Sequence, residues 1–327
     1  MKILNTIILT AALILTGCGK KDTSSADGSG NKPQTKKKLI GISVMTMSNP
    51  FFVDLANAAK DEAKKHGYEV IIYGGEEADK QAKQVRDFIT QNVDAIILSP
   101  KDTQAIGGPI KEANAAGIPV FTADTGCSDK TAKVVCNVMT DNKGGGKLAG
   151  KAMIEALNNK GGKILILDYK EAQSCILRVN GFKEVIDEYN SKNPSAKITI
   201  VAELAGEASE EPSKKATADT LNANPDLAGV FAINDPSALG AVVALKQAGK
   251  MSQVKVIGFD GQLIGKQAIL KGEIYADPIQ FPEEIGRKTV QQIIKYKAAE
   301  EVPAEILIDT KLYYKADAEK DPDLKGK

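Results

Sequence analysis

The chain has 327 residues, and its 43 Lys and Arg residues nearly balance its 42 Asp and Glu residues, for a formal net charge of +1. Such a balance produces no large electrostatic field that would attract nucleic acid or a strongly acidic partner. No stretch after the N-terminal region is apolar and long enough to span a membrane, and the remaining length of about 290 residues favours two domains over a single core.

The N-terminal region predicts an export signal. Lys2 precedes an apolar run over residues 3–15, which is too short for a permanent membrane helix and is followed by small residues. Residues 15–18, Leu-Thr-Gly-Cys, resemble a lipobox, the signal at which a lipoprotein is cleaved before its cysteine and acylated there. We therefore expect a lipoprotein signal peptide over residues 1–17 and lipidation of Cys18. The alternative is an ordinary signal peptide with an incidental cysteine.

Residues 18–37 are expected to form a flexible lipidated linker. The stretch from Gly19 to Gln34 is small, polar and charged, with no large apolar side chain, so it cannot bury enough surface to offset the entropy of ordering. Acyl chains on Cys18 would hold the protein at a membrane surface. The expected location is therefore extracytoplasmic and lipid-anchored to the cell membrane, in a periplasm or on a Gram-positive surface.

From Leu39 onward, short apolar runs alternate with amphipathic segments, a pattern typical of βα units and a parallel sheet. The first series comprises strands at 39–44, 69–73, 94–98 and 119–122 and helices at 51–66, 78–92 and 103–116. A strand at 134–137 leads to a second series, with helices at 142–159, 174–190, 212–223 and 236–248 and strands at 163–167, 198–203, 229–232 and 254–258. A helix at 282–297 and a strand at 311–315 follow. Two such series predict an α/β fold of two doubly wound parallel-sheet lobes.

Polar side chains follow several of the predicted strands. Asn49 precedes Pro50 and a predicted helix, Asp124 follows strand 119–122, Asn234 follows strand 229–232, and Asp260 follows strand 254–258. Ligands of doubly wound sheets bind where the loops at the carboxyl ends of the strands converge. Carboxylates and amides there suit the hydroxyls of a polyol, and an aromatic ring suits the apolar face of a sugar. Each of these residues, taken singly, could instead have no role beyond capping a helix or a turn.

The motifs at these strand ends resemble those of one family along nearly the whole chain, from about residue 39 to 314. They are Asn-Pro-Phe-Phe at 49–52, Asp124, Thr-Asp-Asn at 140–142, Arg178 before Gly181-Phe182, Asn-Asp at 234–235, Gly-Phe-Asp-Gly at 258–261, and Gln280. Together they are similar to the ribose-binding-protein group of periplasmic binding proteins.

The resemblance implies a periplasmic binding protein of type I, whose two lobes are joined by a three-strand hinge. The crossovers would fall near 140–141, 280–281 and 309–310. This division gives an N-terminal lobe of residues 38–140 plus 281–309 and a C-terminal lobe of 141–280 plus 310–327. Sugar would be contacted by Asn49, Phe51, Phe52 and Asp124 from the first lobe, and by Arg178, Asn234, Asp260 and Gln280 from the second lobe or its edge.

The function that the resemblance implies is that of a substrate-binding lipoprotein of an ABC importer. Such a protein captures a monosaccharide or related polyol by hinge closure and delivers it to the permease subunits, and we expect it to act as a monomer. The alternative is a sensor that presents a sugar or autoinducer-2 to a membrane receptor. Thr125 stands where ribose binders carry arginine, and Ala208, beside Glu207, stands where they carry an aromatic residue, so the pocket is expected to be roomier and the sugar is left open.

Other chemistries find little support in the sequence. Residues 145–151 have the spacing of a phosphate-binding loop, but Ala152 follows in place of Ser or Thr, so close packing of small residues is favoured. His66 is the only histidine, which leaves no His-based catalytic pair. Asp124 and Asp260 could form a glycosidase-like pair, but a neighbouring arginine is expected to keep both carboxylates ionised. We therefore expect no enzymatic activity, no cofactor, no metal site and no nucleic-acid partner. We do not expect a sugar-responsive repressor, since the residues before the lobes are predicted to be a signal peptide and a spacer without a helix-turn-helix.

The three cysteines after Cys18 leave one question open. Cys127 and Cys136 flank a short polar turn, and export would permit a disulfide between them. The sequence does not decide between this bond and two free thiols. Cys175 is expected to be a partly buried free thiol.

Overall fold

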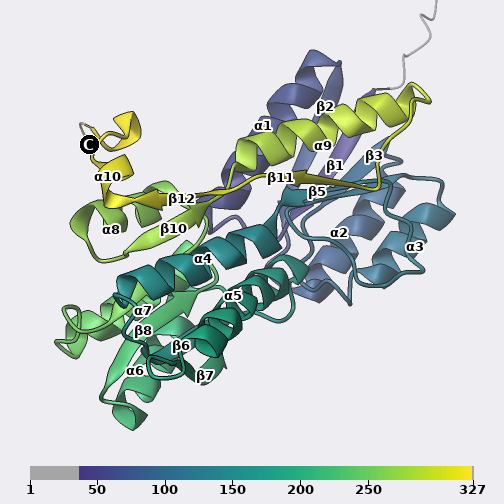
Figure 1. Cartoon of the computed structure of the whole chain (residues 1–327). Coiled ribbons are helices and arrows are strands. Elements are labelled where there is room, and N and C mark those ends of the chain that lie inside the picture. The colour runs from purple at the N-terminus through teal and green to yellow at the C-terminus, as the bar shows by residue number, and fades with distance from the viewer. Residues whose placement is uncertain (1–36, 326–327) are drawn as a thin grey trace, which may run out of the picture. The chain divides into compact units, whose positions relative to one another are not determined.

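The structure, a computed structural model, describes residues 37–325 of the chain. The predicted signal peptide, Cys18 and nearly all of the predicted linker lie outside the described residues. Within residues 37–325, no helix has the length and apolar character needed to cross a membrane. Two sheets with helices on both faces form the α/β fold that the sequence predicts (Figure 1).

The first sheet is entirely parallel and has the strand order β11-β5-β4-β3-β1-β2. Its strands are β1 (Lys38–Val44), β2 (Tyr68–Gly74), β3 (Ala95–Leu98), β4 (Val120–Ala123), β5 (Asn137–Thr140) and β11 (Glu305–Ile308). Strands β3 and β4 are buried at every position, as expected of continuous apolar runs in a sheet covered on both faces.

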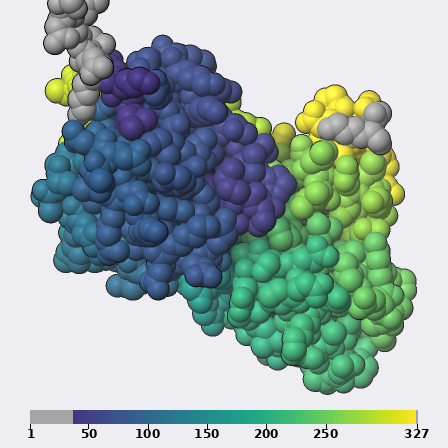
Figure 2. Space-filling view, turned by 180° about the vertical axis from the view of Figure 1, so that it is seen from behind, coloured from purple at the N-terminus to yellow at the C-terminus, as the bar shows by residue number. Residues whose placement is uncertain are grey.

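The second sheet has the order β12-β10-β9-β8-β6-β7 and is parallel except for β12, which runs antiparallel to β10. Its strands are β6 (Gly162–Asp168), β7 (Ile198–Ala205), β8 (Leu227–Ala232), β9 (Lys255–Ile257), β10 (Ala276–Ile279) and β12 (Lys311–Tyr314). The two sheets therefore repeat one architecture, with β1 and β6 in corresponding places. In the space-filling view, the purple and blue residues of the first half meet the green residues of the second along a seam (Figure 2).

Helices pack in pairs on the sheets: α1 with α9 and α2 with α3 on the first, and α4 with α5 and α6 with α7 on the second. Their bounds are α1 (Pro50–Lys65), α2 (Ala78–Thr90), α3 (Gly107–Ala115), α4 (Asn142–Ala156), α5 (Gln173–Lys192), α6 (Glu210–Ala223), α7 (Asp235–Gln247), α8 (Leu263–Lys271) and α9 (Pro282–Lys297). A short helix α10 (Lys315–Ala318) and the 3-10 turn η1 (Pro322–Leu324) follow β12.

The chain passes between the two sheets three times. It leaves the first sheet after β5, returns to it between β10 and α9, and leaves it again between β11 and β12. These passages occur at residues 140–142, 279–282 and 308–311, where the sequence predicts crossovers. The movement of the two halves as separate lobes about these passages stays a prediction.

Several elements differ from the sequence prediction. The helix α8 and the strands β10 and β11 were not predicted, and the strand predicted at 134–137 lies at Asn137–Thr140. Strand β10 contains Asp277-Pro278, a pair that is disfavoured in strands. The helix predicted to begin at residue 103 begins at Gly107, because Oδ1 of Asp102 accepts hydrogen bonds from the amides of Gln104 and Ala105 and holds a turn there.

The glycines of residues 145–151 allow α4 and α5 to pack closely. A Cβ atom on Gly146 would lie 2.0 Å from the carbonyl oxygen of Arg178, and one on Gly181 would lie 2.1 Å from that of Lys143. No side chain fits at such distances. The interpretation of this segment as a packing element is therefore confirmed, and its resemblance to a phosphate loop is incidental.

The disulfide left open by the sequence is not formed, since Cys127, Cys136 and Cys175 are all free thiols. Cys136 is fully buried in the core that contains α1 and α9, whereas Cys127 packs against the separate core beneath α2 and α3. The two thiols thus belong to opposite faces of the first sheet. Cys175 is buried, as predicted, and burial raises the pKa of its thiol to about 12.

Candidate functional site

A small cavity of about 30 Å³ lies between the two halves, among the loops that follow the strands of both sheets. Met45 follows β1 and Tyr169 follows β6, and both residues line this cavity. The cavity therefore lies beside the two strands at which the strand order of each sheet reverses. We call this space the inner cavity. It is lined by Met45, Asn49, Phe51, Phe52, Asp124, Tyr169, Ser174, Cys175, Arg178, Ala208, Asn234 and Asp260.

Seven of the eight predicted sugar-contacting residues line the inner cavity. They are Asn49, Phe51, Phe52, Asp124, Arg178, Asn234 and Asp260, and each is at least nine-tenths buried. The eighth, Gln280, is not among the lining residues. The structure thus brings the predicted set together, and direct contact of these side chains with a sugar stays a prediction.

The beginning of α1 positions three of these residues. Pro50 occupies the first helical turn, and Oδ1 of Asn49 accepts a hydrogen bond of 3.0 Å from the amide of Phe51. Asn49 is therefore a helix cap, yet its Nδ2 makes no hydrogen bond within residues 37–325 and remains available in the cavity. The rings of Phe51 and Phe52 pack edge to face, with centroids 5.1 Å apart. They give the cavity an apolar wall of fixed shape.

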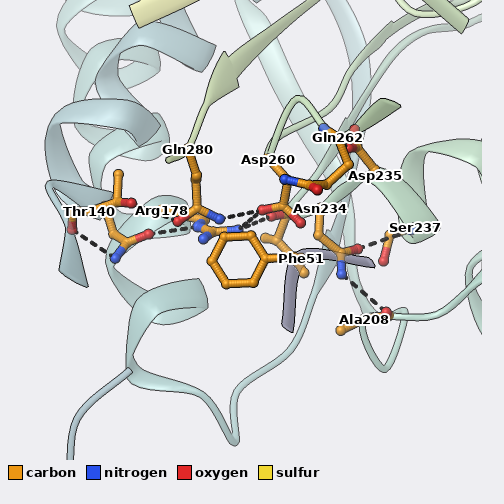
Figure 3. Close-up of polar contacts among 12 residues, drawn as sticks. Phe51, Thr140, Arg178, Ala208, Asn234, Asp235, Ser237, Asp260, Gln262 and Gln280 are labelled. Atoms are coloured by element: carbon orange, nitrogen blue, oxygen red, sulfur yellow. Dashed lines mark hydrogen bonds and ion pairs between the residues drawn. The ribbon is translucent and has the colours of Figure 1, made fainter. Parts of the chain in front are cut away.

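Arg178 is the central cation of the site. Its Nη1 donates to Oδ1 of Asp260 at 2.9 Å and to the carbonyl oxygen of Ile233 at 2.7 Å, and its Nε donates to Asn142 at 2.8 Å. The guanidinium also lies 3.9 Å from the ring centroid of Phe259. These contacts fix the plane of the guanidinium and leave Nη2 without a protein partner among the described residues (Figure 3).

Gln280 supports Asp260 from behind. Its Nε2 donates to Oδ1 of Asp260 at 2.6 Å, and its Oε1 accepts a hydrogen bond of 2.7 Å from the hydroxyl of Thr140. Thr140 ends β5 in the first sheet, and Gln280 follows β10 in the second, so this chain of contacts bridges two of the three passages. The geometry assigns Gln280 a positioning role toward Asp260.

Asp124 is the polar group of the cavity with an unused acceptor. Its Oδ1 is buried without a hydrogen-bond partner in the described part of the chain. Burial raises the pKa of its carboxyl to about 7, although the nearby Arg178 lowers it and Asp260 raises it further. Burial raises the pKa of Asp260 as well, although Arg178 and Gln280 lower it. The expectation that arginine holds both carboxylates in their ordinary ionised state was therefore wrong, because the cost of burying each charge exceeds the attraction of the cation.

Asp124 and Asp260 also share an unusual backbone conformation. Their φ angles are +70° and +100°, in the left-handed region that residues other than glycine rarely adopt. Such strain costs on the order of 1–3 kcal/mol per residue and recurs at ligand sites. Both carboxylates of the inner cavity are thus held in place at some cost to stability.

Asn234 has both a capping and a positioning role. Its Oδ1 accepts from the amide of Ser237 at 3.0 Å and caps α7, and its Nδ2 donates to the carbonyl oxygen of Ala208 at 3.1 Å. Ala208 and the preceding Glu207 have φ angles of +53° and +49°. The side chain of Asn234 therefore fixes a tight turn at the edge of the cavity (Figure 3).

Tyr169 was missed by the sequence analysis. It follows Asp168 at the end of β6 and lines the same cavity as Phe51 and Phe52, so the second half does supply an aromatic side chain there. The same rule that found the other residues, a search of strand ends, would have found Tyr169.

Besides the Thr140–Gln280 contact at the passages, three hydrogen bonds among the described residues join the two halves around the cavity. The hydroxyl of Tyr169 donates to the carbonyl oxygen of Lys101 at 3.0 Å. The amide of Ser174 donates to the hydroxyl of Thr125 at 3.2 Å, and the amide of Thr103 donates to the carbonyl oxygen of Glu171 at 2.8 Å. Thr125, in the position where arginine was expected of ribose binders, thus contacts the beginning of α5.

A second pair of buried carboxyls lies behind Asp260. Asp235 and Asp277 are fully buried, and Oδ2 of Asp235 accepts from the amide of Gln262 at 2.7 Å. Oδ1 of Asp235 and both oxygens of Asp277 have no partner within residues 37–325 unless one of the two acids carries a proton. Burial and the neighbouring carboxylates raise the pKa of Asp235 well above its usual range, and burial raises the pKa of Asp277 to about 7.

The arrangement defines a class of protein. Two similar α/β halves enclose a small cavity with carboxylate, amide and guanidinium groups on its polar side and aromatic rings on the other. Among residues 37–325 there is no group of three or more His, Cys, Asp or Glu side chains that could hold a metal ion. These features are those of a binding site for a small polar ligand between two lobes, and closure of the lobes on that ligand stays a prediction.

Comparison with known proteins places the chain in a family. Residues 40–301 match the family model described as a periplasmic binding protein domain, which covers most of the chain. The chain belongs to this family, and its two parallel-sheet lobes have the type I architecture of that family's solved structures.

Proteins similar to this chain include import binding proteins for sugars. The chain is 36% identical to the ribose import binding protein RbsB of Bacillus subtilis (strain 168), over 88% of this chain and 90% of that protein. It is 32% identical to a D-apiose import binding protein of Paraburkholderia graminis, over 86% of this chain and 89% of that protein. Its structure is similar to an ABC transporter solute-binding protein of Actinobacillus succinogenes with bound D-allose, with a TM-score of 0.78, 27% identity and coverage of 87% and 100% of the two chains. These relatives are sugar- or solute-binding proteins.

Proposed function

We propose that this protein captures a monosaccharide or related polyol between its two lobes and delivers it to the permease of an ABC importer. The observation that carries the proposal is the buried, unpartnered Oδ1 of Asp124 in a cavity that Arg178 and Asp260 share. A buried acceptor without a donor costs about 1–3 kcal/mol, and a ligand hydroxyl would recover that cost. The ribose, apiose and allose named for the relatives are ligands of this kind.

The chemistry of the lining suits a hydroxylated ring. Asp124 and Asp260 accept from hydroxyls, while Nη2 of Arg178 and Nδ2 of Asn49 donate to them. Charge-assisted hydrogen bonds of this type are about twice as strong as neutral ones. Phe51 and Phe52 offer an apolar wall for the C–H face of the sugar.

Ligand capture requires the lobes to part. The inner cavity, at about 30 Å³, has room for only one or two water molecules, so a sugar cannot enter the arrangement seen here without movement. The three hydrogen bonds described across the cleft are few, so they contribute little to holding the two lobes together. A sugar that bridges both lobes would favour the closed arrangement by its higher affinity for that arrangement.

The transport role sets the cellular context of the proposal. A lipoprotein anchored through Cys18 on the outer side of the cell membrane would hold the binding lobes near the permease subunits. A single two-lobed chain contains the whole site, so a monomer suffices. The signal sequence at residues 15–18 supports the anchor, and the similar import proteins support the permease partner.

Native mass spectrometry of the purified protein with a sugar panel tests the proposal. We expect the wild-type chain to retain one sugar, and we expect Asp124→Ala and Asp260→Ala to lower its affinity at least about a hundredfold, since each removes a charge-assisted contact. Asp219→Ala, at an exposed aspartate paired with Lys215, is the matched control and should bind as the wild type does. Unchanged sugar retention in both cavity variants would show that the sugar binds elsewhere.

A further inference from the structure

A cavity of about 270 Å³ lies in the second half of the molecule, and we call it the distal cavity. It shares no lining residue with the inner cavity. Lys255 begins β9, Tyr275 precedes β10 and Tyr314 ends the antiparallel β12, so the distal cavity lies at the end of the second sheet opposite to the loops of the inner cavity. Figure 1 shows the neighbouring elements α8, β10, β12 and α10 together at one end of this half.

The floor of the distal cavity is apolar and rigid. Val254, Val256, Ile269 and Ile274 line it, and each is at most 1% exposed and belongs to the core of the second half. Met251 packs against this core, and its unbranched side chain can adjust to the shape of a ligand. A hydrocarbon group placed on such a floor gains about 25 cal/mol for each Å² of apolar surface removed from water.

Two tyrosines form a fixed aromatic wall beside the floor. The rings of Tyr275 and Tyr314 lie edge to face, with centroids 6.0 Å apart. Their hydroxyls both donate to the carboxylate of Glu155 in α4, at 3.0 Å and 2.9 Å. Because both hydroxyls are already used as donors, this wall offers a ligand ring surface and no hydrogen-bond donor.

Two lysines give the cavity a positive charge. Lys255 and Lys315 line it, and neither side chain has a hydrogen-bond or ion-pair partner within residues 37–325. Glu273 also lines the cavity, but its carboxylate is paired with Lys246 at 2.6 Å. Unpaired ammonium groups beside an apolar surface attract an anion, most strongly at low salt.

We propose that the distal cavity binds a small apolar carboxylate, such as an aromatic or branched aliphatic acid, with its hydrocarbon body on the floor and its carboxylate at Lys255 and Lys315. The volume lies slightly below the range of about 300–1,000 Å³ that is typical of small-molecule sites, which suits an acid with a single ring. A neutral sugar fits poorly, because its hydroxyls would meet a floor without polar side chains. The site belongs to the second half alone and does not depend on the proposed capture of a sugar.

Titration calorimetry with phenylacetate tests the site, and phenylacetamide serves as the neutral probe of the same shape. We expect phenylacetate to bind in a 1:1 ratio and at least about fivefold more tightly than phenylacetamide, as one charge-assisted hydrogen bond to a lysine would give. The difference should shrink as salt is added. Equal binding of the two probes, or no binding of phenylacetate at about 10 mM, would overturn the proposal.

Variants of the lining locate the bound acid. The double variant Lys255→Met and Lys315→Met keeps two long side chains without their charges, so it should abolish the preference for phenylacetate. Lys271→Met, at an exposed lysine in the last turn of α8 that does not line the cavity, is the matched control and should retain the preference. Ala316→Phe fills part of the cavity and should weaken both probes at least about fivefold.

Urea unfolding like that of the wild type shows that each variant is folded. A preference for phenylacetate that survives in the double lysine variant, or unchanged binding in Ala316→Phe, would place the acid elsewhere on the chain and contradict the proposal.

Discussion

Buried acidic side chains form two groups that lie close together in the second half of the molecule. The first group is Asp260 alone, the second is the pair Asp235 and Asp277, and the two groups have different partners. Asp260 is paired with Arg178 and accepts from Gln280, so its charge is compensated inside the protein. Asp235 and Asp277 have no cation and can satisfy each other only through a proton. Arg178 and Gln280 lower the pKa of Asp260 against the larger effect of burial, which raises it, whereas the second group is most stable with one acid protonated. Burial alone therefore does not mark a carboxyl as a ligand group; the nature of its partner does.

Removal of the cation should have the largest effect. Arg178→Met leaves Asp260 buried without its ion-pair partner, which typically costs about 3–5 kcal/mol of unfolding free energy. We expect a loss of this size in urea unfolding, together with loss of sugar binding. Arg86→Met removes an exposed pair with Glu112 and should change the unfolding free energy by less than about 0.5 kcal/mol. A small loss of unfolding free energy in Arg178→Met would mean that the burial of Asp260 does not require the cation.

A substitution in the pair Asp235 and Asp277 should stabilise the protein, whereas Arg178→Met should destabilise it. Because the pKa of Asp277 is about 7 in the folded protein and near 3.8 in the unfolded chain, the unfolded chain loses its proton first as the pH rises. Stability is then lost between about pH 4 and pH 7. Asp277→Asn removes this loss and offers a donor to Asp235. We expect it to raise the unfolding free energy at pH 8 by about 2–4 kcal/mol, given about 1.4 kcal/mol per pKa unit.

Urea unfolding of wild type and Asp277→Asn at pH 5 and pH 8 measures this difference. The gain should be much smaller at pH 5, where the wild-type acid is still protonated. Sugar affinity should stay within about twofold, since neither Asp235 nor Asp277 lines the inner cavity. A variant that is equally destabilised at both pH values would show that the carboxyl of Asp277 is needed for packing and that its protonation is not the cause.

The fold was largely predictable from the sequence, because alternating apolar runs and amphipathic segments report βα units directly. Prediction failed where local signals conflict. Strand β10 was missed because Asp277-Pro278 disfavours a strand, and α3 begins late because the side chain of Asp102 holds a turn. The disulfide stayed undecided because the face of the sheet to which Cys127 and Cys136 belong is set by tertiary packing.

The site was predictable to the extent that it follows from topology. Asp124, Asn234 and Asp260 follow parallel strands, whose carboxyl ends converge at one edge of each sheet, so the structure brings them together. The contact between Gln280 and Asp260 depends on distances near the hinge, which the sequence does not report. The raised pKa of Asp124 depends on its burial, which the sequence does not report either.

The pH dependence of sugar affinity tests whether Asp124 resembles the first group of carboxyls or the second. A ligand hydroxyl donates to the ionised form of Asp124, so binding lowers its pKa and affinity rises as the pH passes through about 7. If only the ionised form binds, the competent fraction increases about tenfold between pH 6 and pH 8, and affinity increases with it.

Calorimetry across this range, with Asp124→Asn as the comparison, measures the effect. The variant cannot ionise at this position and should bind weakly, with much less dependence on pH. An affinity that is flat between pH 6 and pH 8 in the wild type would show that the protonation of Asp124 does not change in this range. An affinity that falls as the pH rises would show that Asp124 binds sugar as a protonated donor, and the unpartnered Oδ1 would then not be the atom that receives the ligand hydroxyl.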